Sequence, residues 1–574
     1  MKAIRRVLDR LAPVLWILIC IVATAAQQSD SQDEPPPIKR AVAPPLGPYA
    51  PGFDALHYDV ALDLPAAGTL IRGLTTIRVG IRVPRAPTLP LDLTGLAVDR
   101  VRVNGSVASF TYDVGKLRVT IPSRARVGDS IAVEVAYHGH PDDGLIIQHN
   151  IHGERTIFAD NWPDRARFWF PSIDHPSDKA TVAFTVSAPE EWSVIANGSL
   201  VSSNRDISIV ADVSATGTTP AIDDRDHARR VWRWRTDRPI PTYTMVIGAA
   251  RFMTAPPVKS CAAGRCVDVT WWAFPADAAA MQRSVRRADA MVRYFAELIG
   301  PYEYEKLAHV ESSTIFQGME NTSAIFYPEK ALAAGHNLES TVAHETAHQW
   351  FGDSTTPRNW SDLWLSEGFA TYFDALFYEH ADGEAAFRQK MNDSRDRYLK
   401  SPVITRPVVD TDERDLLALL NRNSYEKGAW VLHMLRRMLG DRVFFSGVRA
   451  YYRQHRLGNA TTADLQAALE QSAGRPLDWF FHQWLDEPGY PKLRSHWDWV
   501  SRRREITITI DQTQPASWPT FRLPLTIEID GGTRTRHDVE MTGRTHVYSF
   551  PSATRPTRVI LDPDEAILKA IDPS

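Results

Sequence analysis

At 574 residues the chain is too long for a single hydrophobic core, so two to four domains are expected. Hydrophobic residues make up 44% and charged residues 23%, which is ordinary for a soluble globular protein. The net charge of −4 and the lack of a long basic run argue against nucleic acid as a partner, because phosphate binding requires a clustered basic surface.

The N-terminal residues 1–26 have the pattern of a secretory signal peptide. Four basic residues precede an apolar run over 11–26, which ends in the small residues Ala23, Ala25 and Ala26. We therefore expect a periplasmic or secreted protein with no stable membrane insertion. The alternative is an uncleaved signal that anchors the chain through residues 11–26, although a run of about 16 residues is short of the roughly 20 that a span needs.

A Pro-rich linker over 27–51 precedes a region of strand-like sequence over 52–255. Apolar residues alternate with other residues along this region, which is typical of half-buried antiparallel strands. The polar stretch 203–230 is expected to be a surface loop. The alternating residues include Tyr58, Val60, Leu62, Ile77, Val79, Ile81, Val182, Phe184 and Val186.

Two cysteines remain if Cys20 leaves with the signal peptide. Cys261 and Cys266 bracket a short segment that can form a tight turn, so they predict a small disulfide loop. A disulfide agrees with an oxidising compartment, and the alternative is a pair of free thiols.

Residues 256–490 form an α-rich region in which helix signals replace the alternation. Thr461 and Asp464 have the pattern of a capping box, and Gly474 follows as a helix end. The expected helices cover 278–298, a segment from Asn337 to about 351, a segment from Ser361 or Asp362 to about 380, 415–439, and the helix that begins at Thr461. Alternation returns over 491–574, which predicts a small C-terminal β-sandwich and completes a multidomain α+β fold.

The chemistry centres on the segment 344–348, which reads His-Glu-Thr-Ala-His. On a helix His344 and His348 share one face, so both imidazoles can reach the same metal ion. Glu345 can then reach a water molecule at that ion. The pattern alone is a moderate signal, because two ordinary helical histidines can produce it.

Glu367 follows His348 after eighteen residues and falls on the next predicted helix, which can pack antiparallel to the first. Two histidines and one glutamate leave a tetrahedral position open, as catalysis requires. A glutamate among Trp364, Leu365 and Phe369 is costly to bury without a cation, which favours a ligand over an exposed helix carboxylate.

Together these residues resemble the signature of the gluzincin zinc peptidases, and further motifs narrow the resemblance to the aminopeptidase N family. The resemblance covers roughly residues 53–565. The additional motifs are Gly318-Met319-Glu320-Asn321, Gln349-Trp350-Phe351-Gly352, Trp360 with Asp362 and Trp364, Tyr425 to Gly428, Arg167 to Pro176, Asp478 to Trp484, and Gly489-Tyr490-Pro491.

The resemblance implies a thermolysin-like catalytic domain over 256–490 with one Zn²⁺ per chain. His344, His348 and Glu367 would hold the zinc ion. Glu345 would act as general base, and the Tyr425 hydroxyl would stabilise the oxyanion. The implied activity is hydrolysis of the N-terminal peptide bond of peptides that carry a free N-terminus, by a chain expected to be a monomer.

Substrate contacts are also implied. Glu320 would pair with the substrate α-ammonium, which an internal peptide bond lacks, and Gly318, Met319 and Asn321 would belong to the substrate site. The family adds a second amine contact from the N-terminal domain. A direct count puts Trp162 at that place, so Asp160 or Asn161 is expected to supply it.

Two further departures from the family pattern concern the site. Gln317-Gly318 stands where the family usually has Gly-Ala, and Ser366 replaces the usual Asn before the third ligand. Two other functions remain open, namely a zinc endopeptidase of the same fold and a non-catalytic peptide-binding or scaffold protein. An epoxide hydrolase side activity, found in one branch of the family, is also compatible with the sequence.

Overall fold

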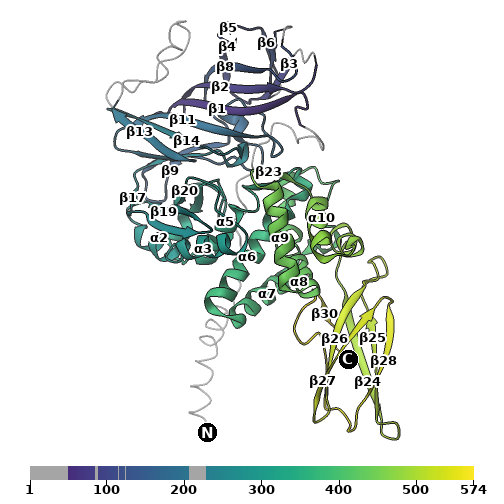
Figure 1. Cartoon of the computed structure of the whole chain (residues 1–574). Helices are drawn as coiled ribbons and strands as arrows, with labels where there is room; N and C mark the ends of the chain where they lie inside the picture. The colour runs from purple at the N-terminus through teal and green to yellow at the C-terminus, as the bar shows by residue number, and fades with distance from the viewer. Residues whose placement is uncertain (1–48, 85–87, 114, 123–124, 206–227, 574) are drawn as a thin grey trace, which may run out of the picture. The chain divides into compact units, whose positions relative to one another are not determined.

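The computed structural model describes residues 49–84, 88–113, 115–122, 125–205 and 228–573, which belong to one compact unit. Strands dominate the first part of the chain, helices the middle and strands again the end, which confirms the predicted α+β fold (Figure 1). The predicted signal peptide lies outside the described residues, as does the predicted linker up to residue 48.

The largest sheet is built from the alternating segments of the N-terminal part. Tyr58, Val60 and Leu62 of β1 are buried as predicted, and Tyr58 stands opposite Ile77 of β2 and Val182 of β11. Pairing is antiparallel with β2 but parallel with β11. The strand order is β13-β14-β11-β1-β2-β8-β4-β5, with β15 beside β11. Their bounds are β1 Phe53–Asp63, β2 Ile71–Ile81, β4 Ala97–Val103, β5 Ser106–Val107, β8 Ser130–Gly139, β11 Lys179–Pro189, β13 Ser199–Arg205, β14 Arg229–Arg235 and β15 Ile240–Pro241.

The loop predicted over 203–230 is shorter than expected. Residues 203–205 form the end of β13 and residues 229–230 form the start of β14. The two strands are paired up to Arg205, which stands opposite Arg230. Residues 206–227 lie outside the described chain. Two smaller sheets, β12-β16-β10-β9 and β3-β7-β6, complete this part. Their strands are β3 Thr88–Asp92, β6 Phe110–Asp113, β7 Lys116–Thr120, β9 Leu145–His149, β10 Arg155–Ala159, β12 Ser193–Ala196 and β16 Ile247–Ala250, with the short helices η1 Ala166–Phe168 and η3 Thr242–Thr244 between them.

The middle part of the chain contains a second sheet in addition to its helices. Its order is β17-β19-β20-β21, with β18 beside β19, and β20 pairs in parallel with both neighbours. The predicted disulfide is confirmed, because Cys261 and Cys266 face each other across the β18–β19 hairpin and are bonded. The strands are β17 Met253–Thr254, β18 Val258–Ala262, β19 Arg265–Ala273, β20 Lys306–Ser312 and β21 Ala324–Pro328.

The helix predicted over 278–298 is instead two helices, α2 and α3. The Ser284 hydroxyl, at the end of α2, accepts a hydrogen bond from the backbone N–H of Leu338. Arg287, which precedes α3, pairs with Glu339 and Asp382. These contacts with distant residues fix the break, and nothing in the local sequence indicates them.

The helix predicted over 415–439 is also interrupted. Asp415 caps the short helix η6, and the Asn423 side chain donates to the backbone carbonyls of Val403, Arg406 and Pro407. A π-helix, η7, therefore precedes α8. The capping box at Thr461 and the helix end at Gly474 are confirmed. The helices of this part are α2 Ala278–Ser284, α3 Ala288–Leu298, α4 Glu329–Ala333, α5 Glu339–His348, η4 Trp360–Asp362, α6 Trp364–Asp382, α7 Glu384–Leu399, η5 Pro402–Thr405, η6 Leu416–Leu419, η7 Asn423–Lys427, α8 Gly428–Leu439, α9 Asp441–His455, α10 Thr462–Ala473, α11 Asp478–Phe481 and η8 His482–Asp486, with β22 Thr355–Pro357 pairing β23 Gly458–Ala460.

The C-terminal part is the expected sandwich of two sheets. Ile506, Ile508 and Ile510 of one sheet and Leu525 and Ile527 of the other are buried. Across the residues that the structure describes, no helix combines the length and the apolar character needed to cross a membrane. The sheet orders are β28-β25-β24-β30 and β27-β26-β29, with β24 Lys492–Val500, β25 Glu505–Gln512, β26 Leu523–Asp530, β27 Arg534–Met541, β28 Thr545–Pro551, β29 Arg558–Leu561 and β30 Ala570–Ile571.

Candidate metal centre

Two histidines and a glutamate from neighbouring helices converge on one point. His344 and His348 lie on the same face of α5, and their Nε2 atoms are 3.1 Å apart. Glu367 of α6 places Oε2 3.3 Å from both nitrogens. The centre of this nearly equilateral triangle is about 1.9 Å from each atom, close to the bond lengths of roughly 2.0–2.2 Å that zinc makes with histidine and carboxylate. The donor set therefore fits zinc.

The second ring nitrogen of His348 is held in place by its surroundings. Its Nδ1 lies 3.1 Å from the Phe351 carbonyl oxygen and 3.0 Å from the Ser366 Oγ. A carbonyl can only accept, so Nδ1 carries the hydrogen and Nε2 keeps its lone pair for a metal. A methyl group on Gly352 would lie 2.5 Å from the Ser366 Oγ, so a glycine leaves room for this hydroxyl.

The helices that carry the site meet at a pair of glycines. A methyl group on Gly368 would lie 2.9 Å from the backbone of Gly428, and one on Gly428 would lie 3.0 Å from the Cα of Gly368. The backbones of α6 and α8 are therefore in direct contact one residue after Glu367 and three residues after Tyr425. This close backbone contact fixes the Glu367 and Tyr425 side chains relative to each other.

The carboxylates of the centre differ in charge state. Burial raises the pKa of Glu367, but His348 and His344 outweigh it and lower this pKa to about 2. Burial raises the pKa of Glu345, and His348 opposes the shift. Glu367 is thus ionised, as a ligand must be.

Glu345 occupies space that a side chain at position 318 would fill. A methyl group on Gly318 would lie 2.2 Å from the Glu345 Oε1. Ligand atoms of Glu320, Glu345 and His348 also lie within 4.8 Å of one another. The base predicted from the sequence and the predicted amine contact are therefore both beside the metal centre.

Glu320 follows an isolated β-bridge between Met319 and Phe326. Met319 exchanges two backbone hydrogen bonds with Phe326 of β21, at 2.9 and 3.0 Å, and Gln349 donates to the Glu320 carbonyl at 2.8 Å. Burial raises the pKa of the Glu320 carboxyl to about 7, with His348 and a hydrogen bond from Tyr243 opposing the shift. A substrate cation would compensate for the burial of this carboxylate.

Tyr425 lies on the π-helix η7 and lines the same cavity as the metal centre. Its ring stacks on the His344 ring with centroids 5.9 Å apart and an angle of 12° between the planes. Burial raises the pKa of its hydroxyl, and the nearby carboxylates of Glu367, Glu320 and Glu345 raise it further. The hydroxyl therefore stays protonated and can donate a hydrogen bond.

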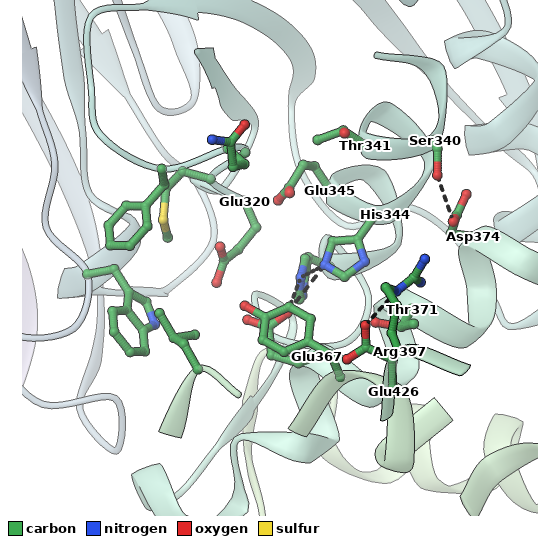
Figure 2. Close-up of a pocket in the computed structure, with 18 residues that line it drawn as sticks. Glu320, Ser340, Thr341, His344, Glu345, Glu367, Thr371, Asp374, Arg397 and Glu426 are labelled. Atoms are coloured by element: carbon green, nitrogen blue, oxygen red, sulfur yellow. Dashed lines mark hydrogen bonds and ion pairs between the residues drawn. The ribbon is translucent and has the colours of Figure 1, made fainter. Parts of the chain in front are cut away.

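These groups line one cavity of about 400 Å³, drawn in Figure 2. Figure 2 shows Glu320 on one side of His344 and Glu367, with Asp374, Arg397 and Glu426 on the other side. The cavity is lined by Trp162, Phe316, Gln317, Gly318, Met319, Glu320, Ser340, Thr341, His344, Glu345, His348, Glu367, Thr371, Asp374, Arg397, Leu420, Tyr425 and Glu426.

Two residues predicted to contact substrate do not line the cavity. Asp160 is buried and forms an ion pair with Arg165 at 2.5 Å, so the structure does not bring it to the cavity, and the amine contact predicted for it stays a prediction. Asn321 is also fully buried and is absent from the lining residues.

Several lining residues were missed by the sequence analysis. Phe316, Leu420 and Arg397 belong to no motif and reach the cavity from separate segments. Tyr243 supports the site from behind the lining, and no sequence motif marks it. Its hydroxyl lies 3.3 Å from the Gly352 carbonyl and forms a hydrogen bond with Glu320. Trp162 was found only by its place in the family pattern, where an acidic or amide residue is usual.

The chain is similar to known proteins over most of its length. The model of the peptidase M1 N-terminal domain matches residues 54–243, and the model of the peptidase family M1 domain matches residues 281–484. Aminopeptidase N of Streptomyces lividans is 28% identical over 465 residues, which are 76% of this chain and 50% of that protein. The chain spans about half the length of the curated relatives it matches.

Two solved structures illustrate the likeness in fold. An M1 zinc metallopeptidase from Deinococcus radiodurans is 26% identical with a TM-score of 0.65, over 79% of this chain and 97% of that chain. Aminopeptidase A of Legionella pneumophila, in complex with aspartic acid, is 16% identical with a TM-score of 0.76, over 91% of this chain and 60% of that chain. With two domain models of one family matched in order across more than half of its residues, the chain belongs to the peptidase M1 family of zinc metallopeptidases.

Proposed function

We propose that the protein is a zinc aminopeptidase that hydrolyses the N-terminal peptide bond of unblocked peptides. The observation that carries this proposal is a buried carboxylate, Glu320, within 4.8 Å of His348 and of the predicted base Glu345 in one cavity. A free α-ammonium is the group of a peptide that such a carboxylate attracts, and an internal peptide bond lacks it.

In this proposal His344, His348 and Glu367 hold the zinc ion. Zinc bound there supplies a Lewis acid for the scissile carbonyl and the attacking water. The side chains have complementary roles. Ionised Glu367, His344 and His348 each provide one electron pair. The Phe351 carbonyl and Ser366 keep the His348 ring oriented.

Glu345 is proposed as the general base. Its carboxylate takes a proton from the attacking water and later gives it to the leaving amine. This carboxylate lies within 4.8 Å of a ligand atom of His348, which places it beside the proposed zinc site. Tyr425 is proposed to donate its hydroxyl hydrogen to the oxyanion, which requires the protonated state that burial maintains.

Acetylation of the substrate tests the assignment of Glu320. A free leucyl peptide and its N-acetyl form present the same scissile bond, but only the first carries a cation. We expect hydrolysis of the free peptide alone, with loss of activity in a chelator and recovery with added zinc. Equal cleavage of both peptides would instead establish an endopeptidase, and no cleavage by zinc-loaded protein would favour a scaffold.

The Glu320→Ala variant provides the matching test on the enzyme. It removes the amine contact without touching a zinc ligand, so we expect an unchanged zinc content and a large loss of kcat/KM on free peptides. A variant with normal aminopeptidase rates would contradict the role of Glu320.

We also propose that the protein acts in the periplasm or is secreted. The disulfide between Cys261 and Cys266 supports an oxidising compartment, and the sequence of residues 1–26 supports export. Cell fractionation with N-terminal sequencing tests this proposal, since a mature chain that begins near residue 26 in the periplasm agrees with it. Light scattering of the same material tests the expected monomer.

A further inference from the structure

The segment 160–165, which precedes η1, contributes Trp162 to the cavity that Glu320 also lines, and Arg165 holds this segment in place. Arg165 is buried and donates to Asp160 at 2.5 Å, to Asp143 at 2.7 Å and to the Trp162 carbonyl at 2.8 Å. The second carboxylate oxygen of Asp160 accepts from the Ile315 backbone at 3.4 Å. Both oxygens of Asp160 thus have partners in the protein, and Asp160 does not line the cavity.

Asn161 is equally committed to the protein interior. Its side-chain nitrogen donates to the Thr242 and Met245 carbonyls at 3.1 and 2.6 Å, and its oxygen accepts from the Trp169 indole at 2.8 Å. Of residues 160–162, Trp162 is therefore the one that lines the cavity. The place where the family pattern has a second polar amine contact is occupied by an indole.

Trp162 is part of an aromatic wall. Its ring packs edge-on against Phe316 with centroids 6.0 Å apart and against Trp360 at 5.4 Å. The Arg165 guanidinium lies over the Phe316 ring at 5.7 Å, so the arginine that holds Trp162 also holds its neighbour. Met319 and Leu420 supply further apolar lining. These four lining side chains form the wall: Trp162, Phe316, Met319 and Leu420.

The charges of the cavity oppose an acidic substrate side chain beside Glu320. Glu320, Glu345 and Glu367 all line the cavity. Arg397 is the one lysine or arginine among the described residues that line the cavity, and it pairs with Glu426 at 3.0 Å. Figure 2 shows Arg397 and Glu320 on opposite sides of His344 and Glu367. A carboxylate placed next to Glu320 would meet like charges, and Arg397, which lies across the cavity, is already paired with Glu426.

We infer that this cavity selects peptides whose first side chain is large and apolar, with Trp162 as the specificity-determining residue, and that Glu320 is the single carboxylate that anchors the amine. The inference rests on the proposed aminopeptidase function. A side chain attached next to the anchored amine extends from Glu320 toward Met319 and the aromatic wall, where burial favours apolar carbon and desolvates charge.

The first experiment compares fluorogenic aminoacyl amides on the wild-type zinc enzyme. We expect kcat/KM at least about tenfold higher for Leu and Phe than for Ala, because each added methylene in an apolar pocket is worth about tenfold or more. Gln and Glu substrates differ mainly in charge, and we expect at least about a hundredfold preference for Gln. Inhibition constants for free Leu, Ala and Glu should follow the same order.

The second experiment changes the wall. In Trp162→Ala the ratio of kcat/KM for Phe over Ala should fall at least about tenfold, whereas Trp162→Phe should keep most of that ratio. Trp497→Ala, which removes a half-buried indole from β24, is the matched control and should keep the wild-type ratio. Zinc content and thermal melting are measured for each variant.

Each outcome is decisive. Preference for Glu over Gln, or for Ala over Leu and Phe, overturns the inference while the aminopeptidase function stands. An unchanged Phe-to-Ala ratio in folded, zinc-containing Trp162→Ala also overturns it. If Trp162→Ala does not fold, the wild-type substrate order and the inhibition constants still test the inference. Absence of hydrolysis of every unblocked amide by the zinc-loaded wild type refutes the proposed function itself.

Discussion

Replacing Gly368 by alanine tests whether the close contact between α6 and α8 positions the reacting groups. The added methyl would lie 2.9 Å from both the Cα and the carbonyl carbon of Gly428 and 3.3 Å from the Ser424 carbonyl oxygen. Carbon atoms in ordinary contact are about 3.5–4.0 Å apart, so the two backbones must separate by roughly 0.6–1 Å. These neighbours are backbone atoms, which cannot avoid the methyl by a side-chain rotation.

The expected cost follows from that displacement. Inserting a methyl into a packed contact destabilises a protein by about 1–3 kcal/mol. Glu367 precedes Gly368, and Tyr425 lies three residues before Gly428, so the separation moves a zinc ligand relative to the proposed oxyanion donor. A misplacement near 1 Å costs about a hundredfold in rate, so we expect kcat to fall by about that factor.

The assay combines three measurements on purified protein: zinc per chain, the melting temperature and kcat with KM on an unblocked leucyl amide. Gly428→Ala should act in the same direction, since its methyl would lie 3.0 Å from the Gly368 Cα. Gly80→Ala is the control, because its methyl meets nothing closer than 3.7 Å. Wild-type kcat and melting temperature in Gly368→Ala would refute the view that this contact holds the site together.

Three further predictions concern the base, the ligand support and pH. Glu345→Gln should retain zinc but lose about 10²–10⁴ in kcat, as measured on the leucyl amide beside zinc analysis, and substantial turnover would contradict its role as base. Ser366→Ala should weaken zinc binding by about tenfold in a chelator competition. This is the low end of the loss expected when a ligand histidine loses a supporting contact, because the Phe351 carbonyl still holds His348. An unchanged zinc affinity would mean that the hydroxyl is dispensable. Burial, a hydrogen bond with Asp277 and nearby acidic charge raise the pKa of Glu311 to about 9, so the folded state binds more protons than the unfolded state and stability should fall as pH rises from about 5 to 9. Melting curves across this range should be flatter for Glu311→Gln than for the wild type, and parallel curves would count against this assignment.

The sequence predicts the chemistry of the site better than its shape. The zinc ligands are readable because a helix places residues four apart on one face, and the spacing to Glu367 matches a family pattern. Tyr425 and Glu320 are readable for the same reason, because each lies in a short motif. Apolar alternation also predicted strands such as β1 and β2 well, since a period of two places every second side chain on the buried face of a sheet.

Tertiary contacts account for what the sequence did not predict. The break between α2 and α3 depends on Ser284 bonding Leu338 and on Arg287 pairing with Glu339, and neither partner is close in sequence. The π-helix before α8 depends on Asn423 bonding carbonyls about twenty residues away. Propensity within a window carries no information about such partners, so continuous helices were predicted in both places.

The position of Asp160 has the largest functional consequence among these differences. An acidic residue near the expected position was a reasonable amine contact, but Arg165 pairs with it from five residues further along. The pairing leaves Trp162 as the side chain that faces the cavity, so one buried ion pair changes the chemistry of the wall from polar to aromatic. The zinc ligands lie in a motif that the sequence shows directly, whereas the chemistry of this wall depends on which side chain an ion pair holds away from the cavity.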